Sequence, residues 1–216
     1  MKNSNTTCLI GQPLQRDLEA ELGVPVTLAN DANCFALAEA RLGAGRAAET
    51  VFGVILGTGV GGGVVVGQRA LHGCQGIAGE WGHNLLEPQG PKCYCGRRGC
   101  VETILSGPFL ERFYAERSGA HRALPEIAAR RADDSHAAAT MERLAVYFGR
   151  AISSVINILD PDVVVLGGGV SNIEILYEEG VCETARHVFN NRLETQIVKN
   201  ELGDSAGVFG AAMLVA

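Results

Sequence analysis

VFGVILGTGVGGGVVV, residues 51–66, decides the fold, because it places a glycine-rich turn between two runs of β-branched and apolar residues. This pattern predicts a strand, a tight turn and a second strand. Another glycine cluster, residues 167–169, directly follows the apolar run 163–166. Both glycine clusters therefore lie where a predicted strand ends.

Helical and extended patterns alternate on both sides of this hairpin. Ahead of it, the sequence predicts a helix over residues 13–22, a strand over 24–29 and an alanine-rich helix over 32–42. Behind it, we expect helices over 106–114, 137–159, 171–192 and 206–215, and strands over 163–166 and 196–199. This order predicts a mixed α/β fold.

Composition narrows the class of protein. The 216 residues include 18 Lys plus Arg and 24 Asp plus Glu, a formal charge of −6, which gives no basic surface for nucleic acid. We find no secretory signal, and the uncharged stretch 51–67 contains too much glycine for a membrane span. Seven cysteines, an odd number, fit a reduced protein with a metal site better than a disulfide framework. We therefore expect a cytoplasmic protein that binds neither nucleic acid nor membrane.

The most specific group of residues lies in the irregular loop 73–99. His83 is followed by Cys93, Cys95 and Cys100, and three thiolates with one imidazole are the tetrahedral set that structural zinc prefers. Nearby glycines would let the backbone turn sharply enough for these side chains to converge. The alternative is that three reduced cysteines simply lie in a glycine-rich loop.

Two acidic residues flank this group. Glu80 and Glu102 would be held at fixed positions by a folded metal loop, as hydrogen-bond acceptors for a polyhydroxylated ligand, or they are solvated carboxylates. Asp31 joins a predicted strand end to a helix start, where it could act as a general base or as a plain helix cap. Sequence alone leaves these alternatives open.

The two glycine clusters offer backbone N–H groups to phosphates. Gly57, Thr58 and Gly59 combine such groups with a hydroxyl, although hairpin turns rich in glycine are common. Gly167 and Gly168 either admit a nucleotide to the backbone or allow close helix–strand packing. Neither cluster decides the function alone.

Taken together, these motifs resemble the ROK family (repressor, open reading frame, kinase) of sugar kinases from about residue 3 to the end. Four motifs carry the resemblance: LANDAN at 28–33, LGTGVGGG at 56–63, EWGH at 80–83 leading to CYCGRRGCVE at 93–102, and VLGGGV at 165–170. The resemblance implies an actin-like ATPase (ribonuclease H-like) fold. It also implies ATP-dependent phosphorylation of a hexose, with ATP, Mg²⁺ and Zn²⁺ as cofactors.

The resemblance assigns a role to each site residue. Asp31 would be the catalytic base, and the sugar hydroxyls would be bound by Asn30, Glu80, His83 and Glu102. The nucleotide phosphates would meet Gly57, Thr58 and Gly59, and adenosine would meet Gly167 and Gly168. His83 would use one ring nitrogen for zinc, beside Cys93, Cys95 and Cys100, and the other for sugar.

Within the family, NDANC at 30–34, AGEWGHN at 78–84 and NILDPDV at 157–163 are most similar to bacterial fructokinases of broad hexose range. We therefore expect phosphorylation of the 6-hydroxyl of fructose or a related hexose. The alternatives are an N-acetylglucosamine kinase or a glucokinase of the same family. A sugar-responsive transcription regulator and a noncatalytic sugar- and zinc-binding module are alternatives of another class.

One family motif is missing. Members begin with a strand carrying Asp-x-Gly-Gly-Thr, a phosphate and magnesium loop, and no such motif occurs here. We therefore expect residues 1–45 to be a remnant of a small N-terminal α/β domain, and residues 46–216 to be a complete large domain with a zinc loop at 73–102. We also expect weak or no turnover, a homodimer, and no helix-turn-helix ahead of residue 10.

Overall fold

A single five-stranded sheet organises the computed structural model, which describes residues 7–215. Its strand order is β3-β2-β1-β4-β5. β1 (Thr50–Leu56) and β2 (Val60–Val66) form the predicted antiparallel hairpin, and β3 (Arg69–Ala70) extends it. β4 (Val163–Gly167) and β5 (Gln196–Lys199) add in parallel on the other side of β1. The strands predicted from the apolar runs around residues 51–66, 163–166 and 196–199 are thereby confirmed.

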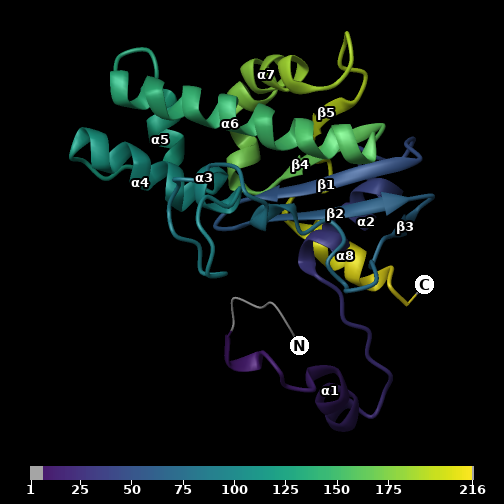
Figure 1. Cartoon of the computed structure of the whole chain (residues 1–216). Coiled ribbons are helices and arrows are strands. Elements are labelled where there is room, and N and C mark those ends of the chain that lie inside the picture. The colour runs from purple at the N-terminus through teal and green to yellow at the C-terminus, as the bar shows by residue number, and fades with distance from the viewer. Residues whose placement is uncertain (1–6, 216) are drawn as a thin grey trace.

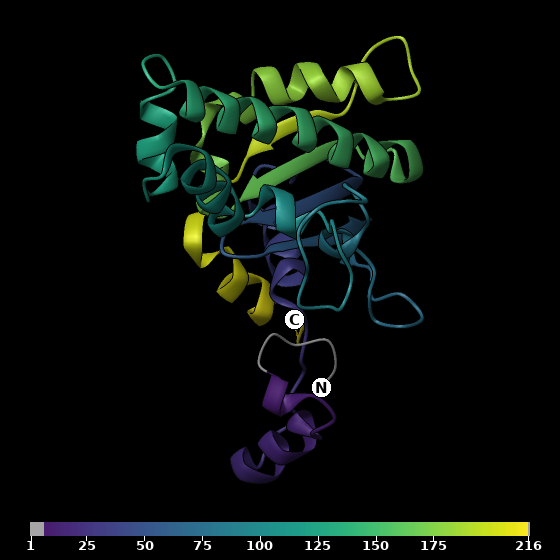
Figure 2. The same cartoon turned by 60° about the vertical axis from the view of Figure 1, so that its left-hand side comes forward.

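Helices cover both faces of this sheet (Figures 1 and 2). One face carries α6 (Ser135–Leu159) with α7 (Glu179–His187) outside it, and α3 (Glu102–Leu105), α4 (Gly107–Ser118) and α5 (Leu124–Ala129) beside it. The opposite face carries α2 (Asp31–Leu42) and α8 (Ala206–Ala212). The mixed α/β prediction is therefore confirmed. Among the helices of the described residues, none combines the length and apolar character needed to cross a membrane.

The alternation of side chains along each strand divides the core into two layers. Phe52 and Val54 of β1 pack with the α6 side, whereas Val51 packs with α2. In β4, Val164 and Val165 divide in the same way. Because successive side chains of a strand point to opposite faces, a strand covered on both sides reads as an unbroken apolar run. This is why β1 and β4 were recognisable from sequence.

Helix α2 is fixed at both ends by side chains. At its start, the Asn30 side chain caps the helix by accepting a hydrogen bond from the Ala32 N–H at 2.8 Å. Near its end, the fully buried carboxylate of Glu39 accepts hydrogen bonds from the N–H groups of Ala44, Glu201 and Leu202 at 3.0, 3.2 and 2.9 Å. Glu39 therefore connects α2 to the segment that leads into α8.

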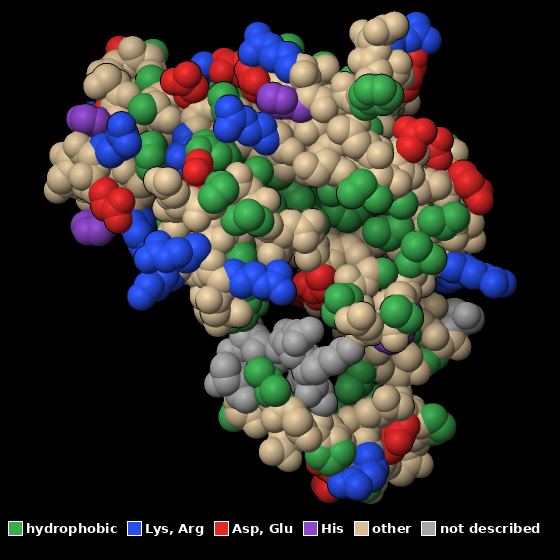
Figure 3. Space-filling view, viewed as in Figure 1, with side chains coloured by type: hydrophobic (Ala, Val, Ile, Leu, Met, Phe, Trp, Pro, Cys, Tyr) green, Lys and Arg blue, Asp and Glu red, His purple; other side chains and the backbone are tan. Residues whose placement is uncertain are grey.

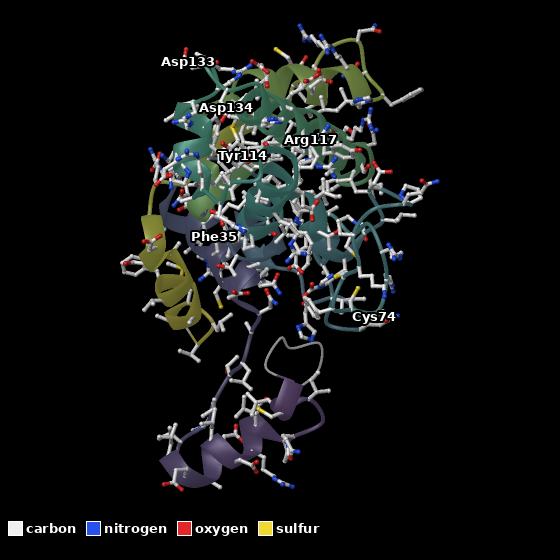
Figure 4. All side chains as sticks on the ribbon, turned by 90° about the vertical axis from the view of Figure 1, so that its left-hand side faces the viewer. Phe35, Cys74, Tyr114, Arg117, Asp133 and Asp134 are labelled. Atoms are coloured by element: carbon white, nitrogen blue, oxygen red, sulfur yellow. The ribbon has the colours of Figure 1, made fainter. Side chains whose placement is uncertain are left out.

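Helix α6 begins at a comparable cap on the opposite face. The Asp134 carboxylate accepts hydrogen bonds from the backbone N–H groups of His136 and Ala137. Tyr114 of α4 donates its hydroxyl proton to the same carboxylate at 2.7 Å, and Figure 4 shows the two residues near each other. The hydrogen bond from Tyr114 lowers the pKa of the Asp134 carboxyl below its usual value. This contact ties α4 to the start of α6.

The N-terminal arm, residues 7–30, lies apart from the sheet in both cartoon views (Figures 1 and 2). Its predicted helix is confirmed as α1 (Leu14–Leu22), after a short 3₁₀ turn, η1 (Thr7–Leu9). The predicted strand over 24–29 is wrong, because none of the described strands pairs with this segment and most of its residues are exposed. A strand needs a partner to satisfy its backbone groups.

The division into units 1–45 and 46–216 remains a prediction. Helix α2 belongs to the first unit by sequence, yet it packs against the sheet of the second. Residues 1–6 of the first unit and residue 216 of the second lie outside the described residues.

The continuous helix predicted over 171–192 is also wrong. The segment forms the 3₁₀ turns η3 (Gly169–Asn172) and η4 (Glu174–Leu176), then α7, and leaves the helix at Val188. The buried Ser171 hydroxyl donates to the Gly168 carbonyl at 2.7 Å, and Tyr177 donates its hydroxyl proton to the Ser171 carbonyl at 2.7 Å. These contacts hold tight turns where helical spacing predicted a helix.

Candidate active site and metal centre

The glycine run of β2 lets two elements approach the same strand from opposite faces. A Cβ at Gly63 would lie 2.6 Å from the carbonyl oxygen of Ala32, at the start of α2. A Cβ at Gly62 would lie 2.6 Å from Cδ1 of Trp81 in the turn η2 (Trp81–His83). Any larger residue would push one of these elements away, since real Cβ atoms do not approach other heavy atoms so closely. The run therefore positions both α2 and η2.

This arrangement gathers the predicted acidic residues around one opening. The Asn30 amide donates a hydrogen bond to the Glu80 carboxylate at 3.4 Å, which connects the α2 cap to η2. Glu102, the first residue of α3, accepts a hydrogen bond from the Val60 N–H at 3.1 Å. Asp31 is exposed, whereas Glu80 and Glu102 are half-buried. The site thus presents carboxylates in different environments.

Glu80, one of the two half-buried acids, has a shifted pKa. Desolvation raises the pKa of the Glu80 carboxyl above its usual value, and the charges of Asp31 and Glu102 raise it further against the opposing effect of His83. Clustered carboxylates repel one another, so the group is expected to interact with hydrogen-bond donors or cations. Hydroxyl groups of a polar ligand are suitable donors.

The four predicted metal ligands converge. The candidate donor atoms of His83, Cys93, Cys95 and Cys100 all lie within 4.8 Å of one another. The Cys93 sulfur is 3.6 Å from Nδ1 of His83, and the sulfurs of Cys95 and Cys100 are 3.6 Å apart. Gly99 has φ +65°, and a Cβ there would collide with the Glu87 carbonyl oxygen. The loop therefore closes only with glycine at this position.

The chemistry of this donor set fits zinc. Burial raises the pKa of the Cys93 thiol and raises the pKa of the Cys100 thiol to about 12. The pKa of the Cys95 thiol is lowered instead, because desolvation is outweighed there by hydrogen bonds from the Arg97 backbone and the neighbouring cysteines. A divalent ion would stabilise the thiolates of the two buried cysteines directly. Three sulfurs and one imidazole nitrogen favour zinc over magnesium or calcium. Zinc itself stays a prediction, and its ligands are in place for it.

A cleft of about 1700 Å³ opens between the N-terminal arm and the rest of the chain, here called the body. Its walls include Asn30, Asp31, Gly57, Thr58, Gly59, Glu80, His83, Tyr94, Arg97 and Glu102. In the space-filling view the surface is hollowed between arm and body (Figure 3). Pockets for one small ligand measure roughly 300–1000 Å³, so this cleft has room for two substrates.

Gly167 and Gly168 do not belong to the lining of this cleft. A Cβ at Gly167 would lie 2.6 Å from the ring of Phe35, and Gly168 has φ +82° with a Cβ position 2.4 Å from the Leu56 carbonyl oxygen. Close packing therefore accounts for both glycines. Their contact with adenosine stays a prediction, although the pairing of Ile55 with Gly167 places the ends of β1 and β4 side by side.

Two cleft residues were missed by the sequence analysis. Tyr94 lies between two predicted ligands, and its hydroxyl oxygen is 3.0 Å from Nε2 of His83. Asn33 lines the cleft, and its buried Oδ1 has no hydrogen-bond partner in the described part of the chain. Tyr94 stands inside the cysteine motif and Asn33 inside the LANDAN motif, so both motifs were usable signals, although neither residue was assigned a role.

Comparisons with known proteins agree with this geometry. The sequence profile of the ROK family matches residues 1–216. An N-acetyl-D-glucosamine kinase of Aliivibrio fischeri is 38% identical over 222 residues, which cover 98% of this chain and 73% of that protein. These matches extend over nearly the whole chain.

Solved structures give the same result. A ROK hexokinase from Thermus thermophilus matches with a TM-score of 0.87 and 38% identity, over 95% of this chain and 70% of that one. A ROK family glucokinase from Streptomyces griseus, in complex with glucose and AMPPNP, matches with a TM-score of 0.84 and 31% identity, over 95% and 72%. A ROK family transcriptional regulator, a homolog of the E. coli MLC protein, matches at 0.81 and 28%, over 93% and 54%. The predicted actin-like ATPase fold is thereby confirmed.

Proposed function

The chain belongs to the ROK family, and from this premise we propose that it is an ATP-dependent sugar kinase whose first candidate substrate is N-acetylglucosamine. The observation that carries the proposal is the single cleft in which Asp31 lies among the sugar-binding candidates and beside Gly57 to Gly59. Relatives named as N-acetylglucosamine kinases support the substrate, and the glucokinase bound to glucose and AMPPNP supports the pairing of a sugar with ATP.

Asp31 is proposed to be the general base. It is the first residue of α2, its Oδ1 accepts a hydrogen bond from the Ala32 N–H at 2.9 Å, and it remains exposed to the cleft. That hydrogen bond orients the carboxylate and leaves its other oxygen available to accept the proton of a sugar hydroxyl. Phosphoryl transfer depends mainly on alignment and charge stabilisation, so such a positioned base is the part that the enzyme must supply.

The sugar is proposed to be held by acceptors around the base. Glu80 and Glu102 can accept hydroxyl protons, and Asn30, already bonded to Glu80, offers an amide to the same ligand. His83 presents Nε2, because its Nδ1 faces the sulfur of Cys93. Hydrogen bonds to charged groups are the strong ones, so the two carboxylates are expected to contribute most of the affinity.

The cofactors have separate places in this proposal. His83, Cys93, Cys95 and Cys100 would hold zinc, which supplies a structural link that stabilises the loop and orients His83. Gly57, Thr58 and Gly59 line the cleft at the turn between β1 and β2, where they can meet the phosphates of Mg²⁺-bound ATP. A four-ligand closed set has no open position for catalysis, so zinc takes no part in the transfer itself.

The relatives do not support the fructokinase expectation, and they support the N-acetylglucosamine kinase alternative instead. Similarity of short motifs around residues 30–34 and 78–84 could not separate these substrates, because the same carboxylates serve any hexose. A transcription regulator shares the fold. The position of Asp31 in the cleft favours the kinase, since a sugar sensor needs no base.

Calorimetry on the 216-residue chain tests the proposal through binding, which is independent of the rate of turnover. N-acetylglucosamine, glucose, mannose and fructose would be titrated, followed by ATP with Mg²⁺, and phosphorylation would be followed by coupled ADP release. We expect N-acetylglucosamine to bind more tightly than fructose, and ATP to bind as well. Sugar binding without nucleotide binding would support the noncatalytic module and contradict the kinase.

A pair of variants makes this test specific to the cleft. Glu80→Gln keeps the shape but removes the charge, and should weaken N-acetylglucosamine binding by about tenfold, the difference between a charged and a neutral hydrogen bond. Glu116→Gln, an exposed change on α4, is the matched control and should leave the affinity unchanged. Equal effects of the two variants would show that the sugar binds elsewhere.

A further inference from the structure

Tyr94 lies at the tip of a tight turn in the metal loop. Its neighbours Cys93 and Cys95 are both predicted ligands, and the turn is closed by a hydrogen bond from the Gly96 N–H to the Cys93 carbonyl at 3.1 Å. The ring lines the cleft and is 62% exposed. A large aromatic side chain therefore stands at the opening of the proposed sugar site without being part of the core.

The hydroxyl of this exposed residue is nevertheless engaged. Its oxygen is 3.0 Å from Nε2 of His83, and the two rings meet edge to face with centroids 5.1 Å apart. Among the described residues, His83 is the hydrogen-bond partner of the Tyr94 hydroxyl. The contact thus depends on a single partner, and that partner is a residue of the proposed sugar site.

The hydrogen-bond capacity of His83 makes this contact exclusive. Nδ1 faces the Cys93 sulfur and the metal set, so Nε2 is the nitrogen that remains for the cleft. When Nδ1 binds a metal, Nε2 carries the ring proton and can donate one hydrogen bond. Tyr94 and a sugar hydroxyl cannot both receive that proton.

We propose that Tyr94 occupies the sugar-facing nitrogen of His83 in the sugar-free protein, and that the hexose displaces the Tyr94 hydroxyl when it binds. This inference rests on the proposed function, because it takes His83 as a sugar contact. Displacement breaks one neutral hydrogen bond, after which the exposed phenol bonds to water. Tyr94 is therefore an affinity-determining residue that competes with the substrate.

Tyr94→Phe tests the competition, because it keeps the ring and removes the hydroxyl. A neutral hydrogen bond that no longer has to be broken should tighten N-acetylglucosamine binding by about three- to tenfold in calorimetry. Tyr177→Phe is the matched control: it removes a hydroxyl that is bonded to the Ser171 carbonyl, a contact outside the cleft lining. Its sugar affinity should equal that of the wild-type chain.

A spectroscopic measurement separates competition from a structural role. In ¹H–¹⁵N spectra of the zinc-loaded chain, Tyr94→Phe should shift the Nε2 resonance of His83 without sugar and should match the wild type at saturating N-acetylglucosamine. Unchanged or weaker sugar binding by Tyr94→Phe, or different spectra at saturation, would overturn the inference while leaving the kinase proposal intact. If the wild-type chain bound none of the four sugars, both proposals would fall.

Discussion

Replacing Glu39 with alanine should destabilise the protein although no catalytic group is touched. The carboxylate is fully buried and accepts the N–H groups of Ala44, Glu201 and Leu202. Glu39→Ala leaves these three donors without an acceptor. Each such donor costs about 1–3 kcal/mol, so even at the low end of this range we expect a loss of about 3 kcal/mol in total.

The change should also reach the candidate active site. Asp31 lies eight residues ahead of Glu39 on the same helix, about 12 Å away at 1.5 Å per residue. Without the clamp at its far end, α2 is free to shift along the glycines of β2. We therefore expect weaker N-acetylglucosamine binding together with the lower stability.

Equilibrium unfolding in urea, followed by circular dichroism, measures the effect by linear extrapolation. Glu201→Ala is the control, since its backbone N–H is retained and its carboxylate only joins an exposed ion pair with Arg46 at 2.7 Å, worth about 1 kcal/mol or less. The unfolding free energy of Glu39→Gln should lie between those of Glu39→Ala and Glu201→Ala, because the glutamine amide keeps one oxygen as an acceptor. If Glu39→Ala lost no more stability than Glu201→Ala, the three hydrogen bonds to the Glu39 carboxylate would not stabilise the fold as proposed.

Three further predictions concern the base, the metal and the pH dependence. Asp31→Asn should slow phosphoryl transfer by about 10²–10⁴-fold while sugar affinity in calorimetry stays nearly constant, and an equal loss of both would contradict the base role. Cys95→Ser should release zinc, measured by mass spectrometry, and lower the melting temperature by at least about 5 °C, whereas Cys74→Ser, an exposed thiol outside the ligand set, should change neither. Tyr114→Phe should lower the free energy of unfolding, because the lost hydrogen bond depresses the pKa of Asp134 in the folded state. That stabilisation is present above the usual pKa of 3.8 and is lost as the pH falls through the lower pKa of the folded state. The difference in unfolding free energy between wild type and variant, measured by urea titration, should therefore narrow below pH 3.8. A difference that did not change with pH would refute this account.

Much of the fold could be predicted because β1 and β4 are covered on both faces. Their unbroken apolar runs and the glycines that follow them specify strand ends without reference to the rest of the chain. Residues 24–29 carry a similar local pattern and form no strand, since pairing depends on a neighbour that periodicity cannot reveal. The prediction of one helix over 171–192 failed for a related reason, because hydrogen bonds of the Ser171 and Tyr177 side chains replace helical backbone hydrogen bonds there.

The site was predictable where spacing reflects chemistry. The cysteine motif predicted the convergence with His83, since few other arrangements use three thiols and one imidazole within 18 residues. Glu39 gave no such signal, because an acidic residue in a helix usually faces water. The structure shows only that Gly43 leaves room for this carboxylate, since a Cβ there would lie 2.0 Å from Oε2 of Glu39.

The order of the chain has a consequence for synthesis. Every side chain proposed to hold the sugar lies between residues 30 and 102, whereas β4, which contributes to the core beneath α2, begins only at Val163. On the ribosome the loop that carries Cys93, Cys95 and Cys100 thus emerges well before β4, against which α2 packs. The proposed zinc binding by the nascent chain would therefore precede closure of the core.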